Sequence, residues 1–298
     1  MEVSSVEADF DRLAQLDDEG WTANNQYHDF LLKYVPHNCE NALEIGCGTG
    51  AFARLLAARC KHVIALDLSS EMIRVARSRS MQFEHLEFEL ADAIKWNFPQ
   101  SHFDFICSIA TLHHVQQREL FVKMKDALKP RGVLVVLDLV ESSSLVERMF
   151  DVVGLGVSIG LRFIHNGRLK PPLEVRKAWE QHGKHDSYST VSEMRSLADT
   201  ILPGSRLKRH LLWRYSLVYQ KRYDLPKRFP TLAAAWPNVS VAPPAPLSTL
   251  STCPAIGAGN FSLRKPDTMF TAERAWSSEI PVFSVMRLIS SSISLFLS

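Results

Sequence analysis

Short apolar runs alternate with helical patterns over residues 41–140. The apolar runs predict strands, and the segments with helical spacing predict helices between them. The predicted strands are 42–45, 62–67, 86–90, 103–109 and 133–139, and the predicted helices are 51–59, 71–79 and 118–128. Strands rich in Val, Ile and Leu that are separated by helices predict a parallel sheet covered on both faces. We therefore expect an α/β, doubly wound fold.

The flanking segments complete this predicted sheet. Apolar residues at helical spacing predict a helix over residues 10–35, which Pro36 ends. Residues 206–212 and 215–220 predict two further strands that pair as an antiparallel edge. The expected result is a mostly parallel, seven-stranded sheet with an antiparallel edge strand.

Residues 141–186 do not continue the strand–helix rhythm, and we expect this insert to form a cap over a substrate. Its predicted elements are a helix near Ser144–Val153, a basic loop at His165–Lys170 and a helix that follows Pro171-Pro172 and ends at Gly183. After the insert, Thr190-Val191-Ser192-Glu193 fits a capping box that opens the last sheet-covering helix.

Composition divides the chain into three parts. We expect residues 1–40 to form N-terminal lid helices and residues 41–220 to form the main domain, insert included. Residues 221–298 hold nine of the fifteen prolines together with Ser and Thr clusters. This composition, without a sustained period, predicts a disordered tail.

Charge and cysteine content narrow the function classes. The chain has 34 Lys+Arg and 32 Asp+Glu, a net charge of +2. Residues 221–298 carry eight basic and four acidic residues, so residues 1–220 carry −2, which argues against a nucleic-acid partner. Five cysteines without a CxxC pair argue against a disulfide framework or a zinc site. With no visible secretory signal or membrane span, we expect a cytoplasmic protein that holds no metal.

The chemistry-bearing motif is Leu43-Glu44-Ile45-Gly46-Cys47-Gly48-Thr49-Gly50, at the end of the first predicted strand. Glycines there let the backbone turn tightly and approach a ligand. The helix that follows directs its N-terminal N–H groups to the same place. The spacing is GxGxG and not the GxGxxG of dinucleotide turns, and Glu44 lies beside it. An acid at this position suits a cationic ligand better than a diphosphate.

Two further acids end the next two strands. Asp67 ends the second strand, where a carboxylate can accept both hydroxyls of a ribose. Asp92 follows the third strand, where an acid can accept from an exocyclic amine such as that of adenine. Three acids at successive strand ends describe a nucleoside with a cationic amino-acid end, which is the shape of S-adenosylmethionine (SAM). The alternative for Asp92 is a cap or turn residue.

With these motifs, residues 25–220 resemble the class I SAM-dependent methyltransferases. The matching segments are Glu44–Gly50, Asp67, Asp92-Ala93, Phe103–Ser108 followed by Leu112-His113-His114, and Leu128–Leu134, in which Arg131 replaces a commoner glycine. The resemblance implies a Rossmann-like methyltransferase fold and SAM as cofactor. The residues expected at the cofactor are Glu44, Gly46, Cys47, Gly48, Thr49, Gly50, Asp67, Leu68, Met72, Asp92, Ala93 and Ser108.

The candidates for the acceptor side are His113 and His114, which follow the fourth strand. A histidine there could take a proton near neutral pH, or it could cap the next helix or pack against the cofactor. Tyr27 is a candidate lid contact, although a packed aromatic is an equal alternative. His165 and Arg168 could meet an acidic substrate group or form a solvated loop.

We expect SAM-dependent methyl transfer to a small acceptor by in-line displacement in a desolvated pocket. Ser108-Ile109-Ala110 with Leu112-His113-His114 is similar both to ubiquinone/menaquinone methyltransferases and to tRNA wobble-uridine methyltransferases. An RNA substrate is therefore an alternative. A nicotinamide oxidoreductase and a non-catalytic SAM-binding protein are two others, and the GxGxG spacing speaks against the former.

Overall fold

The centre of the protein is a seven-stranded sheet in the order β3-β2-β1-β4-β5-β7-β6. A computed structural model describes residues 3–17, 20–183 and 186–223. The strands are β1 (Asn41–Ile45), β2 (His62–Asp67), β3 (Leu86–Leu90), β4 (Phe103–Ile109), β5 (Leu128–Leu139), β6 (Arg206–His210) and β7 (Arg214–Gln220). Strands β1 to β5 are parallel to one another, and β7 runs antiparallel to β5 and β6. The predicted fold class is therefore confirmed.

Helices cover both faces of this sheet. They are α1 (Val3–Gln15), α2 (His28–Leu32), α3 (Ala51–Ala57), α4 (Ser70–Ser78), α5 (Gln117–Ala127), α6 (Leu145–Asn166), α7 (Leu173–His182) and α8 (Val191–Ile201), with 3-10 turns η1 (Asn25–Tyr27) and η2 (Leu112–His114). One core cluster joins the sheet to α2, α3 and α4, and a second joins it to α5 and α8. Continuous apolar strands are buried on both faces for this reason.

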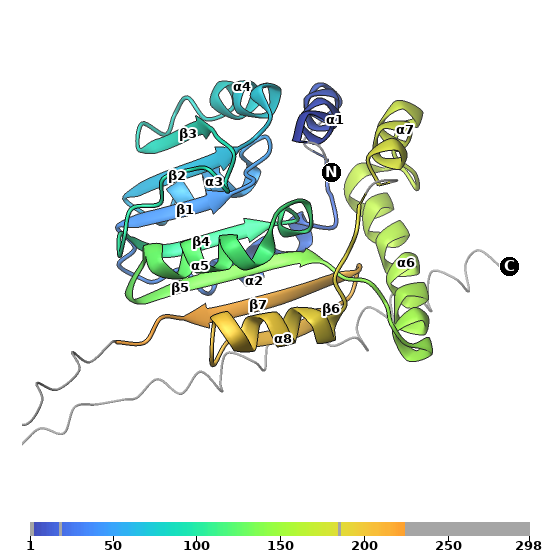
Figure 1. Ribbon diagram of the computed structural model, residues 1–298. Coiled ribbons are helices and arrows are strands. Elements are labelled where there is room, and N and C mark those ends of the chain that lie inside the picture. The colour runs from blue at the N-terminus through green and yellow to red at the C-terminus, as the bar shows by residue number, and fades with distance from the viewer. Residues whose placement is uncertain (1–2, 18–19, 184–185, 224–298) are drawn as a thin grey trace, which may run out of the picture. The chain divides into compact units, whose positions relative to one another are not determined.

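Three helices lie beyond the carboxyl ends of the parallel strands: α1, α6 and α7 (Figure 1). Helix α1 packs against both α4 and α7 through an apolar cluster that includes Leu13, Met72 and Ala178. Ligands of doubly wound sheets bind at this edge. The N-terminal helix and the insert therefore flank the expected site.

The predicted helix over residues 10–35 is wrong in its middle. Helix α1 ends at Gln15, and the chain turns before η1 and the short α2. Asp17 lies outside the helix because its carboxylate accepts hydrogen bonds from the Thr49 hydroxyl and the Arg79 guanidinium, both at 2.7 Å. These contacts with distant residues outweigh the local helical spacing.

Two predicted boundaries also differ. Strand β5 begins at Leu128 and not at 133, because residues 129–132 form an irregularity where the β4–β5 register shifts. Arg131 holds a left-handed φ of 69° there, which explains why glycine is commoner at this position.

Helix α6 continues past residue 153 to Asn166, so His165 is helical and not in a loop. Gly154 resembles a stop, but a Cβ there would lie 3.3 Å from the Leu212 backbone nitrogen, so the glycine permits close packing. The predicted capping box at Thr190 and Glu193 is confirmed. The expected tail lies outside the described residues except for 221–223, and the proposed domain boundaries stay predictions.

Candidate active site

The glycine turn after β1 is held by strand β2. The backbone N–H groups of Gly46 and Cys47 both donate to the Leu66 carbonyl, at 2.8 and 2.9 Å. Gly46 has φ +75°, and a Cβ there would lie 1.9 Å from Thr111 Oγ1. A Cβ on Gly48 would meet nothing closer than Met72 Sδ at 3.9 Å. Gly46 therefore serves close packing, whereas Gly48 leaves room beside Met72.

Asp67 ties the end of β2 to this turn. One carboxylate oxygen accepts the Gly48 N–H at 2.7 Å, and the other accepts the Ser69 N–H at 3.0 Å. Burial raises the pKa of Asp67, and these backbone donors oppose the rise. The carboxylate is thus fixed in orientation at the carboxyl edge of the sheet.

Glu44 is the most buried acid of the expected cofactor site. Its exposed fraction is 2%, and its Oε2 has no hydrogen-bond partner. Burial, with the nearby Asp67 carboxylate as the second cause, raises the pKa of Glu44 well above its usual value. A buried carboxylate without a partner is costly unless a cation or donor reaches it. This part of the site therefore favours a positively charged ligand.

Helix α1 and the turn after it add two acids that the prediction from sequence missed. Asp11 accepts hydrogen bonds from the Ser69 hydroxyl at 2.6 Å and from the Glu71 N–H at 3.2 Å. Asp17 accepts from Thr49, within the glycine turn. Nothing in the local sequence marks these acids, because their partners lie far along the chain.

The remaining expected cofactor residues have their side chains in local turns, in the sheet or against α1. Asp92 forms a turn, in which Oδ1 accepts the Ile94 N–H at 2.9 Å and Oδ2 pairs with Lys95 at 3.0 Å. Ser108 is buried and donates to the Ile45 carbonyl at 3.0 Å, so it links two strands. Met72 is buried against α1, while the side chains at three other positions are buried or half-buried, namely Cys47, Leu68 and Ala93.

His113 is oriented by an acid from β5. Its Nδ1 lies 2.6 Å from Asp138 Oδ1, and its backbone N–H donates to Asp138 Oδ2 at 3.0 Å. With Asp138 as the acceptor, Nδ1 donates this hydrogen bond, so in the neutral ring Nε2 is the nitrogen with the lone pair. Asp138 interrupts the apolar run of the fifth strand, and that interruption was the available sequence signal.

His114 belongs to a second buried group, together with His182 at the end of α7 and Asp186 after it. Its Nδ1 lies 3.5 Å from Asp186 Oδ1, and the two side chains are 6% and 2% exposed. Asp186 Oδ2 accepts the Tyr188 hydroxyl at 2.8 Å, and His182 Nε2 lies 3.7 Å from it. Burial and neighbouring His113 lower the pKa of His114 to about 4. We call His113, His114, His182 and Asp186 the histidine cluster.

Helix α1 also reaches this cluster. The Phe10 ring contacts His114 and His182 edge-on, with centroid distances of 5.4 and 4.7 Å. Asp9 Oδ2 lies 3.3 Å from His182 Nδ1. Asp11, on the same helix, contacts Ser69 and Glu71 on the cofactor side. One helix therefore spans both halves of the candidate site.

The residues expected at the lid and substrate lie apart from the turn. Tyr27 donates its hydroxyl to the Leu211 carbonyl at 2.6 Å, and burial raises its pKa to about 12. His165 is exposed and stacks on Trp21, with ring centroids 5.8 Å apart. Arg168 is half-buried after α6. These placements favour structural roles, and their roles at a substrate stay predictions.

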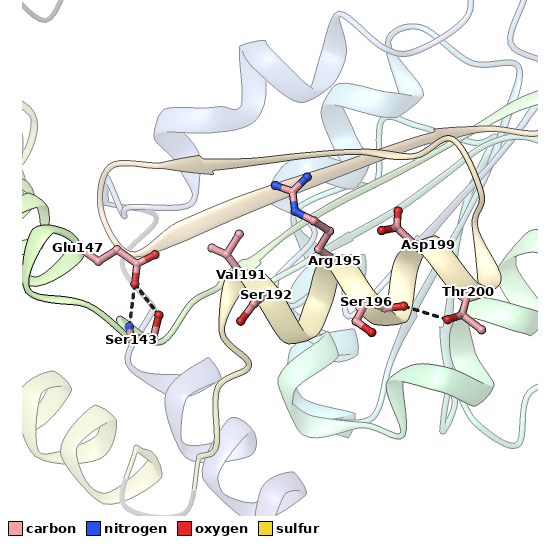
Figure 2. A pocket seen from close by; sticks show the side chains of 8 residues that line it. All are labelled: Ser143, Glu147, Val191, Ser192, Arg195, Ser196, Asp199 and Thr200. Carbon is pink, nitrogen blue, oxygen red and sulfur yellow. Dashed lines mark hydrogen bonds between the residues drawn. The ribbon is translucent and has the colours of Figure 1, made fainter.

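A separate, open hollow of about 710 Å³ follows the outer side of α8 (Figure 2). Its lining combines the start of α6 with residues of α8. It contains none of the residues expected at the cofactor or the acceptor. Glu147 in this hollow already accepts the Ser143 N–H at 2.7 Å. The hollow is therefore distinct from the candidate active site. Within the described residues, no helix meets the length and apolarity needed to cross a membrane.

Comparison with known proteins places this site in a family. Residues 43–136 match the family described as "Methyltransferase domain". An uncharacterized methyltransferase of Mycobacterium tuberculosis is 28% identical over 206 residues, which cover 68% of this chain and 98% of that protein. Phosphoethanolamine N-methyltransferase 1 of Zea mays is 36% identical over 106 residues, which cover 35% of this chain and 21% of that protein.

The structural comparison agrees with the sequence matches. One chain of a Haloferax volcanii complex that contains the Trm112 methyltransferase activator aligns with a TM-score of 0.51 and 14% identity. The alignment covers 74% of this chain and 98% of that chain, and at this identity it shows the fold alone. The family match, the long mycobacterial alignment and the fold together show that this chain contains a methyltransferase domain with the class I fold.

Proposed function

We propose that the enzyme methylates a small acceptor held between the glycine turn and the histidine cluster. The observation that carries this proposal is the buried Glu44 carboxylate, whose Oε2 has no hydrogen-bond partner, next to Asp67. SAM carries an ammonium and a sulfonium, so it offers the positive charge that these acids need. The residues present therefore fit this cofactor.

The proposed roles at the cofactor follow from position. Asp67 would accept the ribose hydroxyls, and Glu44 would face the cationic amino-acid end. Asp92 and Ala93 would contact adenine, with Leu68 and Met72 beside it. Bound SAM supplies a methyl group on a positively charged sulfur. Asp11 and Asp17 hold α1 against the turn through Ser69 and Thr49, which excludes water from this side.

The proposed acceptor side is the histidine cluster. Its His113 and His114 follow β4 by a few residues, and Thr111, which packs against Gly46, links them to the turn. Asp138 fixes the His113 ring so that Nε2 is the lone-pair nitrogen, which can bind or deprotonate an acceptor. The buried, neutral His114 adds a second polar group. Orientation and exclusion of water are the main contributions we assign to this pocket.

Relatives and charge support a small acceptor. The maize relative and a demethylmenaquinone methyltransferase of Tropheryma whipplei, 33% identical over 100 residues, are named for small-molecule acceptors. Residues 1–220 carry a net charge of −2, which disfavours a polyanion. The four cysteines among the described residues are free and buried, which suits a reducing cytoplasm.

The test combines calorimetry and a labelled-methyl screen with the full chain. SAM should bind in a one-to-one complex, and label should move from SAM to a component of a metabolite extract. A parallel incubation with total RNA serves as the matched comparison. Transfer to RNA alone would refute the small-acceptor proposal, and failure of SAM to bind would refute the cofactor assignment.

A further inference from the structure

Three polar side chains from separate segments meet in the histidine cluster. His113 and His114 come from η2, and Asp186 follows α7. One potential ligand atom from each lies within 4.8 Å of the others. Their side chains are 5%, 6% and 2% exposed, so the group is enclosed.

Two atoms in this group are buried without a hydrogen-bond partner. They are His114 Nδ1 and Asp186 Oδ1, which lie 3.5 Å apart. A buried polar atom that lacks a partner costs about 1–3 kcal/mol. A cation between an imidazole lone pair and a carboxylate oxygen would satisfy both atoms together.

The surrounding groups orient these side chains as supporting groups do in metal sites. Asp138 accepts from His113 Nδ1 at 2.6 Å, which fixes the ring and leaves the other nitrogen available. The Tyr188 hydroxyl donates to Asp186 Oδ2 at 2.8 Å, which leaves Oδ1 available. Imidazoles and carboxylates that bind metals are usually held by such outer partners.

We propose that His113, His114 and Asp186 bind one divalent metal ion of the zinc class. Two imidazoles and one carboxylate are typical ligands of Zn²⁺, and three protein ligands leave a fourth position open. With the ion bound, His113 and His114 act as its ligands, and the role proposed above for a free His113 Nε2 applies to the metal-free protein. No spacing in the sequence signals this site, because the ligands lie on two distant connections of the fold.

Cobalt absorption provides the test, since it reads metal binding and not methyl transfer. The full chain is freed of metal with a chelator and titrated with Co²⁺. We expect the visible bands of four- or five-coordinate Co²⁺ at one ion per chain, and their loss when Zn²⁺ is added. If the wild-type protein gives no such bands, the proposal is wrong.

Near-isosteric variants show whether these residues hold the ion. Asp186→Asn and His114→Gln should each weaken Co²⁺ binding by at least about 10-fold, since each removes a ligand. His37→Ala, which removes an exposed imidazole, should bind as the wild type does. Circular dichroism and SAM affinity establish that each variant is folded. Equal affinity in the ligand variants and the wild type would overturn the assignment.

A measurement on the wild-type protein covers the case in which a variant does not fold. Zn²⁺ should shift the side-chain ¹⁵N resonances of His113 and His114 in long-range ¹H–¹⁵N spectra and leave those of His37 in place. Unchanged resonances of both cluster histidines would contradict the proposal.

Discussion

The cofactor side and the acceptor side of this enzyme share one edge of the sheet but are assembled differently. On the cofactor side, a single turn and the ends of β1 and β2 supply the principal groups, and backbone N–H groups fix Gly48, Asp67 and Leu66 relative to one another. On the acceptor side, η2, the end of β5 and the segment after α7 each supply one or two side chains. Geometry within a short stretch of chain fixes the cofactor side, whereas the acceptor side depends on packing between segments far apart in the sequence.

Burial differs between the same two regions. Helices α3 and α4 bury their apolar side chains against the sheet. Helix α6, in the insert, leaves many large apolar side chains exposed, namely Leu145, Val146, Met149, Phe150, Val152, Val153, Leu155, Ile159, Phe163 and Ile164. The insert therefore contributes less apolar burial per residue to the fold. We expect the two sides to respond differently to substitution.

The largest expected effect is a loss of turnover when the acceptor side is substituted. His113→Ala should lower kcat by about 10²–10⁴-fold, because it removes a buried group expected to act on the acceptor. The SAM dissociation constant should stay within about twofold of wild type. Turnover with the identified acceptor and calorimetry with SAM measure the two effects. His37→Ala, at an exposed position with no proposed role, is the control, and a parallel loss of SAM affinity in His113→Ala would show that the two sides are not separable.

Stability should be most sensitive at the glycine turn. Gly46→Ala combines a positive φ with a Cβ placed 1.9 Å from Thr111 Oγ1, so we expect a loss on the order of 3 kcal/mol in the free energy of unfolding. Gly48→Ala, also at positive φ but in open space, should cost about 1 kcal/mol. Urea denaturation compares them, and equal losses would refute the steric argument.

Asp67→Asn tests the cofactor side alone. Loss of the charge should raise the SAM dissociation constant about 10–100-fold, since hydrogen bonds to charged groups contribute about 1.5–3 kcal/mol. Asparagine keeps one acceptor oxygen for the Gly48 or Ser69 N–H, so the turn should persist. Calorimetry measures the affinity. Wild-type affinity in this variant would contradict the assignment of Asp67 to the ribose.

The smallest effect concerns the pH dependence of SAM affinity. Burial raises the pKa of Glu44, so at pH values below that pKa the free protein holds a proton there that a cationic ligand must displace. Affinity should therefore rise with pH through the Glu44 titration, by at most about 10-fold per pH unit, and level off above it. Calorimetry in buffers of different ionisation enthalpy should detect proton release. In Glu44→Gln that release should disappear, and its persistence would assign the proton elsewhere.

The sequence predicted the sheet well because its signals are local. Strands with continuous apolar runs, such as Phe103–Ile109, have the bounds expected from the pattern. Contacts between residues far apart in the sequence explain the predicted helix bounds that were wrong. Asp17 leaves the predicted helix to meet Thr49, and Gly154 resembles a stop but lies against Leu212. These partners are far apart in the chain, so no local pattern could reveal them.

In the candidate site, too, local features could be predicted from the sequence and long-range partners could not. The positions of Glu44 and Asp67 at strand ends could be predicted, because parallel strands bring their carboxyl ends to one edge. His113 and His114 could be singled out, but not their pairing with Asp138 and Asp186, which depends on how β5 and the insert fold back. A charged residue within the apolar fifth strand was the one available clue.

The contact between Gly46 and Thr111 has a consequence for how this enzyme can change. Thr111 fills the space that a side chain on Gly46 would need, and it stands two residues before His113. A substitution that enlarges position 111 would press on the turn that receives SAM. New acceptor preferences are therefore expected to arise through the insert and through positions beyond 111, while this glycine–threonine pair is inherited together.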